Sequence, residues 1–173
     1  ETEEGAVRIR DIVRDLRNFS RPEGESFTES NLNEIVESAL KLVWNKLKYK
    51  CSVEKQLGEL PPVHCNRNQI EQVLVNLMLN AADAVEAGGR IVLRTAHPPG
   101  GGVLFSIEDN GAGIPEEHLN RLFDPFFTTK DVGKGTGLGL SISHGIIEMH
   151  NGSIKVDSSL GEGTRFTVEL PLV

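Results

Sequence analysis

Apolar residues recur every three or four positions along four segments of the chain, and this spacing predicts four amphipathic helices. Pro22 interrupts the pattern after the first segment, and Ser30 or Asn31 is placed to cap the second. The third segment is expected to stop at Gly88 and Gly89, because glycine commonly ends a helix. The expected helices cover residues 4–19, 31–47, 68–87 and 138–150.

Strand patterns lie between these helices. "CSVEKQL" alternates apolar and polar residues, "ELPPVHC" predicts a short extended piece, and "HPPGGG" is expected to join two strands into a hairpin. A turn and a short helix are expected after residue 109. The expected strands are 51–57, 90–96, 102–109, 152–159 and 163–173. This order predicts an α+β fold, a two-layer sandwich in which three helices cover a mixed sheet of about five strands, preceded by an N-terminal helix.

Composition narrows the possible partners. The chain has 173 residues and a formal net charge of −7, which argues against nucleic acid or an anionic membrane as the main partner. Cys51 and Cys65 lack metal-ligand spacing and suggest a reducing compartment. The sequence has no apolar run long enough to span a membrane and no visible signal peptide. Because the chain begins at Glu1 rather than Met, we expect it to be a piece of a longer protein.

Polar residues follow one side of the third expected helix at spacings of three and four. They are Gln69, Gln72, Asn76, Asn80 and Asp83. A solvated face would explain them, but such faces usually carry lysine, glutamate and arginine, whereas asparagine disfavours helix interiors. An amide oxygen can bind a hard cation such as Mg²⁺, whose other ligands are water and phosphate oxygens. The helix is therefore a candidate metal and phosphate site.

Two glycine-rich segments add to this pattern. "DNGAGI" (109–114) follows a strand, and Asp109 could accept a hydrogen bond from an amino group such as that of adenine, although "DNG" also suits an ordinary turn. In "GKGTGLGLSIS" (133–143), four alternating glycines enter a helix directly, which favours an anion site at the helix N-terminus over a flexible hinge. Lys130 and Lys134 add positive charge there.

A phenylalanine-rich segment lies between the two glycine segments. "FDPFFTTK" (123–130) holds Phe123, Phe126 and Phe127, three of the seven phenylalanines of the chain. Core packing would explain one or two of them. Three in one loop beside a glycine-rich segment predict a mobile flap whose apolar side covers a ligand.

Taken in this order, the segments resemble the ATP-binding catalytic domain of bacterial two-component sensor histidine kinases, in the superfamily that includes gyrase, Hsp90 and MutL. "NLMLNAADA" is similar to the N box, "DNGAGIP" to the first glycine box, "LFDPFFTTK" to the F box and "GKGTGLGLSI" to the second glycine box. The resemblance covers roughly residues 66–171 and implies the Bergerat ATP-binding fold. Residues 4–22, "EGAVRIRDIVRDLRNFSRP", resemble the second helix of a dimerisation and phosphotransfer hairpin. The resemblance therefore implies two domains, 1–22 as part of that hairpin and 23–173 as the catalytic domain.

The resemblance implies ATP and Mg²⁺ as cofactors and gives roles to single residues. Asn80 would bind Mg²⁺, Asn76 would lie near the phosphates and Asp83 would play a supporting part. Lys130 or Lys134 would reach the terminal phosphates.

For the rest of the nucleotide, Asp109 would read the adenine amino group, Ile114 would pack on the base, and Thr164 would complete the pocket through water. Gly111 and Gly113 would let the backbone pass close to the base. Gly135, Gly137, Leu138 and Gly139 would hold the phosphates through backbone amides. The other implied nucleotide-binding residues are Phe123, Thr128, Thr136 and Leu140.

The implied reaction transfers the γ-phosphoryl group of ATP to a histidine. The five histidines of the chain are His64, His97, His118, His144 and His150, and none of them fits the acceptor pattern. We therefore expect the acceptor to lie outside this piece and the piece alone not to be phosphorylated. The implied partners are the acceptor helix of the same protein and a response-regulator receiver domain. The full-length protein would be a homodimer, while the piece itself is compatible with a monomer. It would work in the cytoplasm, whether or not the parent is anchored in the inner membrane.

One position separates this reading from related enzymes. In the hydrolases of the superfamily a glutamate lies four residues before the metal-binding asparagine, where this chain has Asn76, and an amide cannot serve as a strong base. This argues against an ATP-driven topoisomerase, chaperone or repair clamp. The alternatives that stay open are a non-catalytic nucleotide-binding or dimerisation module and a related protein serine kinase.

Overall fold

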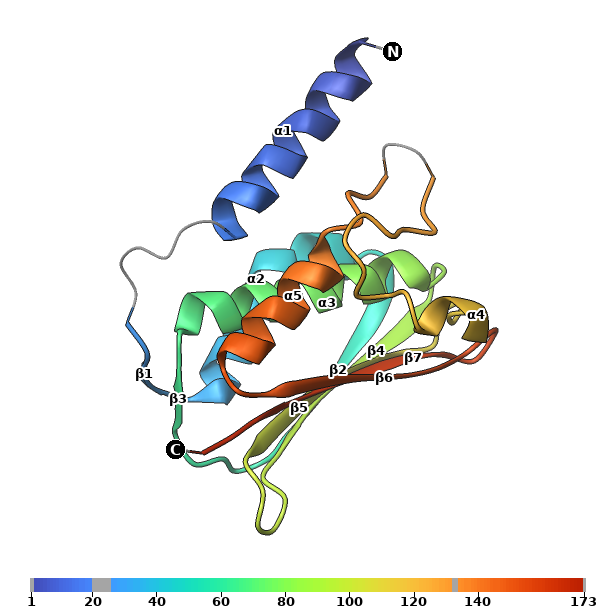
Figure 1. Ribbon diagram of the computed structural model, residues 1–173. Helices are drawn as coiled ribbons and strands as arrows, with labels where there is room; N and C mark the ends of the chain where they lie inside the picture. Colours follow the sequence, from blue (N-terminus) through green and yellow to red (C-terminus); the bar gives the residue numbers. More distant parts are fainter. Residues whose placement is uncertain (1, 20–25, 132–133, 173) are drawn as a thin grey trace.

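The fold has two layers, a mixed sheet and a layer of helices on one face of it (Figure 1). The computed structural model describes residues 2–19, 26–131 and 134–172. Its elements are α1 (Thr2–Phe19), β1 (Thr28–Ser30), α2 (Leu32–Leu47), β2 (Cys51–Leu57), β3 (Val63–Cys65), α3 (Arg67–Ala84), β4 (Gly89–Ala96), β5 (Val103–Asp109), α4 (Glu116–Leu119), α5 (Gly139–Met149), β6 (Ser153–Ser159) and β7 (Gly163–Leu170). The predicted α+β sandwich and its N-terminal helix are confirmed.

The main sheet has the strand order β2-β4-β5-β7-β6. β2 pairs with β4 in parallel, and the other neighbours pair antiparallel, so the predicted hairpins β4–β5 and β6–β7 both form. β1 and β3 form a separate two-stranded antiparallel ribbon. The sequence pattern predicted β3 only as an extended piece and did not predict β1, because three-residue strands are too short to show alternation.

The core lies between the sheet and helices α2, α3 and α5. The apolar side of α3 predicted from the sequence is buried in full, and its members are Ile70, Val73, Leu74, Leu77, Met78, Ala81 and Val85. From the sheet, Phe105 and Ile107 of β5 are among the most buried side chains. Helix α2 begins after Asn31, whose side chain accepts a hydrogen bond from the Asn33 N–H and thus acts as the predicted cap.

Helix α3 ends three residues earlier than predicted. Its last residue is Ala84, and Val85 is extended, with ψ of 149°, so that its side chain turns into the core. Gly88 has the expected positive φ of 84°, but it serves the turn into β4, where its N–H donates to the carbonyl of Lys50 at 2.8 Å. The prediction of a helix to residue 87 was therefore wrong, because burial of Val85 overrides continuation of the helix.

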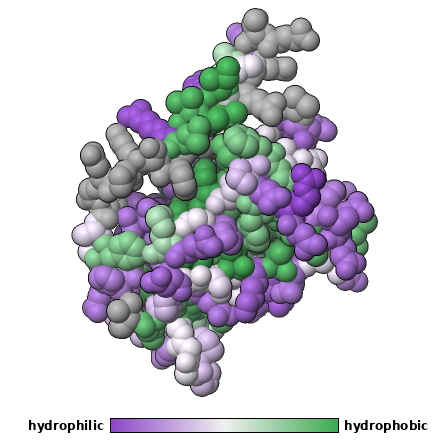
Figure 2. All heavy atoms as spheres, in the orientation of Figure 1, coloured by the Kyte–Doolittle hydropathy of each residue, from purple (hydrophilic) through white to green (hydrophobic). Residues whose placement is uncertain are grey.

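Helix α1 lies outside the two layers and projects from them (Figure 1). Its apolar stripe is largely exposed, with Val7, Ile9, Val13 and Leu16 between 45% and 64% exposed, while Ile12 packs against the edge of the core. Figure 2, in the same orientation, shows green hydrophobic atoms gathered where the helix projects. The predicted boundary at residue 22 falls outside the described residues. Across the described ranges, no helix combines the length and apolarity needed to cross a bilayer.

His150 joins the end of α5 to the start of α3. Its Nδ1 lies 2.7 Å from the carbonyl of Ile146, and its Nε2 accepts the backbone N–H of Asn66 at 3.0 Å. The ring is buried and lies 4.6 Å from the ring of Phe27. Nδ1 must donate to the carbonyl and Nε2 must accept, so the imidazole is neutral. Burial lowers the pKa of His150, and the hydrogen bond to Ile146 only partly offsets this effect.

We predict that His150 makes the fold sensitive to acid. Because its pKa is lower in the folded state than the value of about 6.5 in the unfolded chain, its contribution to stability is present above that pH and is lost as the pH falls through the folded value. The variant His150→Gln can still donate and accept but cannot take up a proton. We expect its melting temperature to be below that of the wild type at pH 7.5 and the gap to narrow as the pH falls to 5.

Thermal unfolding followed by circular dichroism measures this gap across the pH series. His97→Gln, at an exposed position, is the control and should follow the wild-type curve. A gap that stays constant with pH would show that the imidazole contributes by packing alone.

Candidate functional site

Two asparagines on the polar side of α3 differ in how they are held. The Nδ2 of Asn76 donates to the hydroxyl of Ser143 on α5 at 3.0 Å. The half-buried side chain of Asn80, one turn later, makes no hydrogen bond within the described ranges. Asn76 is thus fixed by the fold, whereas the amide of Asn80 has all its hydrogen-bonding capacity available for a ligand.

The N-terminus of α5 lies directly beside Asn76. A Cβ added to Gly139, the first residue of α5, would lie 2.3 Å from the Oδ1 of Asn76, so only glycine leaves room for the amide. The first turn of a helix has N–H groups without helical partners, and the N–H groups of Gly139 and Leu140 donate to no described residue. Leu138 precedes the helix without a side-chain cap. These N–H groups lie where the sequence predicts an anion site, and a helix N-terminus of this kind suits an anion.

Asp109 is the last residue of β5. It is 6% exposed, and its Oδ1 accepts the N–H of Gly111 at 2.9 Å. Burial raises the pKa of Asp109 above its ordinary value, although the N–H groups of Gly111 and Thr164 act in the opposite direction. The carboxyl group is therefore costly to keep ionised in the fold, a pattern that is frequent at functional sites.

The early end of α3 fixes the glycine loop that follows Asp109. The carbonyl of Ala84 has no helical partner and accepts the N–H of Ala112 at 3.1 Å. A Cβ on Gly111 would lie 2.4 Å from the same carbonyl oxygen, and a Cβ on Gly113, at φ of 73°, would lie 2.0 Å from the carbonyl oxygen of Ser159. The close approach that these two glycines permit is thus to the backbone of the protein itself, and that contact alone requires glycine at both positions.

Ser158 holds the loop that follows Asp109 against the β6–β7 hairpin, although the sequence pattern did not single it out. Its hydroxyl donates to the carbonyl of Gly163 at 2.9 Å and accepts the N–H of Ile114 at 2.8 Å. It also lies 2.8 Å from the hydroxyl of Thr164, its register partner on β7. Because Ser158 has one proton, the hydroxyl of Thr164 donates to it and keeps lone pairs for a further contact.

Residues 123–138, called here the phenylalanine loop, lie between α4 and α5 in the chain. Its base is closed by the N–H of Phe126, which donates to the carbonyl of Gly137 at 2.9 Å; both residues have positive φ, 67° and 71°. Phe123 and Phe127 pack against the core, and Phe123 lies 5.1 Å from the ring of His144 on α5. Only Phe126 of the three is exposed. The prediction that three rings cover a ligand is therefore wrong for Phe123 and Phe127, which anchor the loop instead.

The remaining predicted residues of the loop lie beyond this base. The hydroxyl of Thr128 accepts the N–H of Lys130 at 3.1 Å, and the hydroxyl of Thr136 accepts the N–H of Leu138 at 3.3 Å. Leu140 packs against the core from the first turn of α5. Gly133, the first of the four alternating glycines, lies outside the described residues.

Asp83 ties the phenylalanine loop to two helices. Its carboxylate accepts the Nζ of Lys130 at 2.7 Å and the Nζ of Lys46 on α2 at 2.8 Å. Burial raises the pKa of Asp83, but the two lysines outweigh it, so the pKa lies below its ordinary value. Lys134 pairs instead with Asp131 at 3.5 Å within the loop. The sequence pattern had no means to identify Lys46, since it lies 37 residues away.

The donor set fits a metal ion only if phosphate supplies part of it. Among the residues that the structure describes, no group of three or more His, Cys, Asp or Glu side chains could hold a metal ion. Asn80 offers one neutral oxygen, one helical turn from Asn76, which lies beside the first turn of α5. This combination suits a cation that arrives with its own oxygen ligands.

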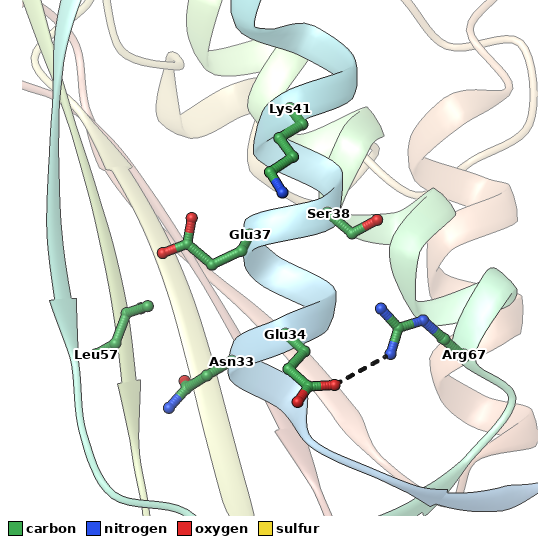
Figure 3. Close-up of a pocket in the computed structure, with 7 residues that line it drawn as sticks. All are labelled: Asn33, Glu34, Glu37, Ser38, Lys41, Leu57 and Arg67. Atoms are coloured by element: carbon green, nitrogen blue, oxygen red, sulfur yellow. Dashed lines mark ion pairs between the residues drawn. The ribbon is translucent and has the colours of Figure 1, made fainter.

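The hollow drawn in Figure 3 belongs to a different part of the molecule. It has a volume of about 470 Å³ on the outer side of α2, where Arg67 and Glu34 form an ion pair of 3.7 Å. Its lining residues are Asn33, Glu34, Glu37, Ser38, Lys41, Leu57 and Arg67. No predicted site residue is among them, so this hollow is separate from the site along α3.

Comparisons with known proteins agree with this geometry. The family model described as "Histidine kinase-, DNA gyrase B-, and HSP90-like ATPase" matches residues 65–173. The sensor kinase CckA of Brucella abortus (strain 2308) is 40% identical over 185 aligned positions, which cover 97% of this chain but 19% of that protein.

Solved structures agree as well. The nucleotide-free catalytic domain of the histidine kinase ThkA has a TM-score of 0.75 and 37% identity, with 84% of this chain and 95% of that chain covered. A structure of ThkA in complex with the response regulator protein TrrA has a TM-score of 0.80 and 32% identity, with 98% of this chain and 48% of that chain covered.

We predict that Gly139→Ala disturbs the site through Asn76. The added methyl group would displace the amide from the hydroxyl of Ser143, which should lower the free energy of unfolding by about 1–2 kcal/mol. Urea unfolding of the wild type and the variant measures the loss.

The matched control is the same substitution in an Asn76→Ala background, where the methyl group has room. In that background Gly139→Ala should lower the free energy of unfolding much less. Equal costs in both backgrounds would mean that the glycine is needed for another reason.

Proposed function

Because this chain belongs to the histidine kinase-, DNA gyrase B- and HSP90-like ATPase family, we propose that it is the ATP-binding catalytic domain of a sensor histidine kinase. It would transfer the γ-phosphoryl group of ATP to a histidine outside residues 1–173. The observation that carries this proposal is the arrangement around Asn76: its amide lies beside the uncapped first turn of α5, and Asn80, one turn further along α3, makes no hydrogen bond within the described residues.

The adenine would occupy the end of the site near Asp109. The buried carboxylate would accept a hydrogen bond from the adenine amino group, which selects adenine over guanine. Ile114, held by Ser158, would pack on the base, and Thr164 would contact it through water with its remaining lone pairs. Gly111 and Gly113 would bring the backbone of the loop close to the base. Gly111 lets this backbone pack against α3, and Gly113 lets it pack against β6.

The phosphates would lie between α3 and α5. The N–H groups of Gly139 and Leu140 would donate to phosphate oxygens, and the segment from Gly135 to Leu138 would line their path. Mg²⁺, held by Asn80, would neutralise charge on the phosphates. Lys130 or Lys134 would contact the terminal phosphate. Asn76 would set the distance between the two helices through Ser143.

Phosphoryl transfer to histidine suits this site better than hydrolysis of ATP. A neutral imidazole is already a nucleophile, whereas water must be activated by a base. Asn76 is an amide and is engaged with Ser143. Asp83 is paired with two lysines that lower its pKa, which makes its carboxylate a poor proton acceptor. The residues along α3 would therefore position the reactants and balance charge without activating water.

The proposed partners follow from the projecting helix and from the relatives. We assign residues 1–22 to a dimerisation and phosphotransfer hairpin and 23–173 to the catalytic domain. The exposed stripe of α1 supports pairing with another helix of such a hairpin and with a second copy. ThkA, a related histidine kinase, has been solved with a response regulator, and a receiver domain would likewise accept the phosphoryl group here. This chemistry would take place in the cytoplasm.

We predict that Asp109→Asn separates binding from stability. The variant would replace the carboxylate that accepts the adenine amino group. A hydrogen bond to a charged group contributes about 1.5–3 kcal/mol, so its loss should weaken ATP binding about ten- to hundredfold. The raised pKa of Asp109 means that ionisation opposes folding as the pH rises, so the variant without nucleotide should melt at the same temperature or higher. Calorimetric titration with Mg-ATP and thermal unfolding measure the two effects.

Two further variants complete this test. Asp157→Asn, at an exposed position on β6, should change neither quantity. Asn80→Ala should weaken binding of Mg-ATP more than binding of ATP in the presence of a chelator. Absence of any nucleotide-dependent rise in the melting temperature of the wild type would favour a non-catalytic module.

We also predict that residues 1–173 need an acceptor supplied from outside. Incubated alone with labelled Mg-ATP, the chain should carry no acid-labile phosphate, because none of its histidines lies in an acceptor pattern. Addition of the upstream hairpin helix of the full-length protein should produce acid-labile label on that helix. Stoichiometric labelling of a histidine within residues 1–173 would contradict the assignment.

A further inference from the structure

Asp83 is the point where three segments meet. One oxygen of its carboxylate accepts Lys46 of α2 at 2.8 Å, and the other accepts Lys130 of the phenylalanine loop at 2.7 Å. Asp83 itself lies three residues after Asn80 on the same side of α3, so the two side chains are neighbours on the helix surface. The lysine pair is thus held next to the residue assigned to the metal.

Lys130 is held at both ends. The hydroxyl of Thr128 accepts its backbone N–H at 3.1 Å, which fixes where the side chain starts. Its Cδ would lie 3.1 Å from a Cβ added to Gly135, so the glycine leaves room for the aliphatic stem. Its ammonium group ends on Asp83. An exposed lysine normally keeps much rotamer freedom, and the hydrogen bond to Thr128 and the ion pair with Asp83 reduce it before any ligand arrives.

We propose that Asp83 is a positioning residue that holds the ammonium group of Lys130 against the terminal phosphate of ATP. This inference rests on the proposed function. An ammonium group has three N–H donors, and Asp83 takes one of them. Lys130 can therefore contact the carboxylate and a phosphate oxygen at the same time. Thr128 and Gly135 act through Lys130 rather than through the nucleotide.

The local charge supports this arrangement. A lone carboxylate beside a triphosphate would repel it, but Asp83 with two lysines carries a net charge of +1. Lys134 offers no comparable group, because it pairs with Asp131 inside the loop and both side chains are about three-quarters exposed or more. Lys130 is therefore the better placed of the two candidate lysines.

The sign of one substitution tests the idea. Asp83→Asn removes a negative charge, which by electrostatics alone would tighten binding of Mg-ATP. If Asp83 positions Lys130, the affinity should instead fall about three- to tenfold, whereas the affinity for Mg-ADP, which lacks the terminal phosphate, should change less than twofold. Calorimetric titration of residues 1–173 with each nucleotide measures both affinities.

A double-mutant cycle assigns the effect to the pair. Lys130→Met should cost the same in Mg-ATP affinity as Asp83→Asn, and the double variant should lose nothing more. Asp83→Glu keeps the carboxylate and should restore part of the ATP-to-ADP preference, a rescue that a purely structural role would not give. The control variant Glu169→Gln breaks another exposed ion pair, with Lys155 at 3.6 Å, and should leave both affinities unchanged.

Three results would overturn the inference. The first is unchanged or tighter binding of Mg-ATP by Asp83→Asn, which is expected if Asp83 only keeps Lys130 away from the nucleotide. The second is an equal loss of affinity for Mg-ATP and Mg-ADP. The third is that the losses of Mg-ATP affinity in the two single variants add up in the double variant. If the wild type bound neither nucleotide, the proposed function would fail and this inference with it. Normal binding by the wild type together with any of the three results would leave the function intact and remove Asp83 from it.

Discussion

Helix α3 packs its apolar side between the sheet and helices α2 and α5, and every part of the site takes its position from this contact. Full burial of a leucine or methionine side chain contributes about 1.5–3 kcal/mol, and Leu74, Leu77 and Met78 are all buried. An asparagine in a helix costs up to about 0.7 kcal/mol relative to alanine. The buried side therefore outweighs the two asparagines on the other side, and the helix can present them without losing its place.

The polar side of α3 then connects to a different element at each level. Asn76 reaches α5, Asp83 reaches the phenylalanine loop and α2, and the free carbonyl of Ala84 holds the loop after β5. Asn80, in the middle, reaches nothing that the structure describes. A single helix thus fixes the distances between the proposed adenine position, the proposed phosphate position and the lysines, while one of its amides makes no hydrogen bond within the described residues.

The sequence predicted the layers of this fold well and its contacts poorly. Periodicity located the buried side of α3 and the two hairpins, because these patterns depend on residues close together in the chain. The same pattern could not show that burial of Val85 ends α3 early, nor that Phe123 and Phe127 pack inward. Ser143, Ser158 and Lys46 were missed because their roles come from partners brought together by the fold. The glycines at 111 and 113 were predicted as site residues, but the contacts that require glycine there are with backbone carbonyls on α3 and β6.

The closed base of the phenylalanine loop has a consequence for how such domains can diverge. Since the hydrogen bond between Phe126 and Gly137 holds the ends of the loop together, the entropy needed to close it grows only with the logarithm of its length, by about 0.6 kcal/mol for each doubling. Insertions between these two residues should therefore burden the rest of the domain very little. Relatives could acquire long or short versions of this segment, each with its own kinetics of nucleotide exchange, on an unaltered frame.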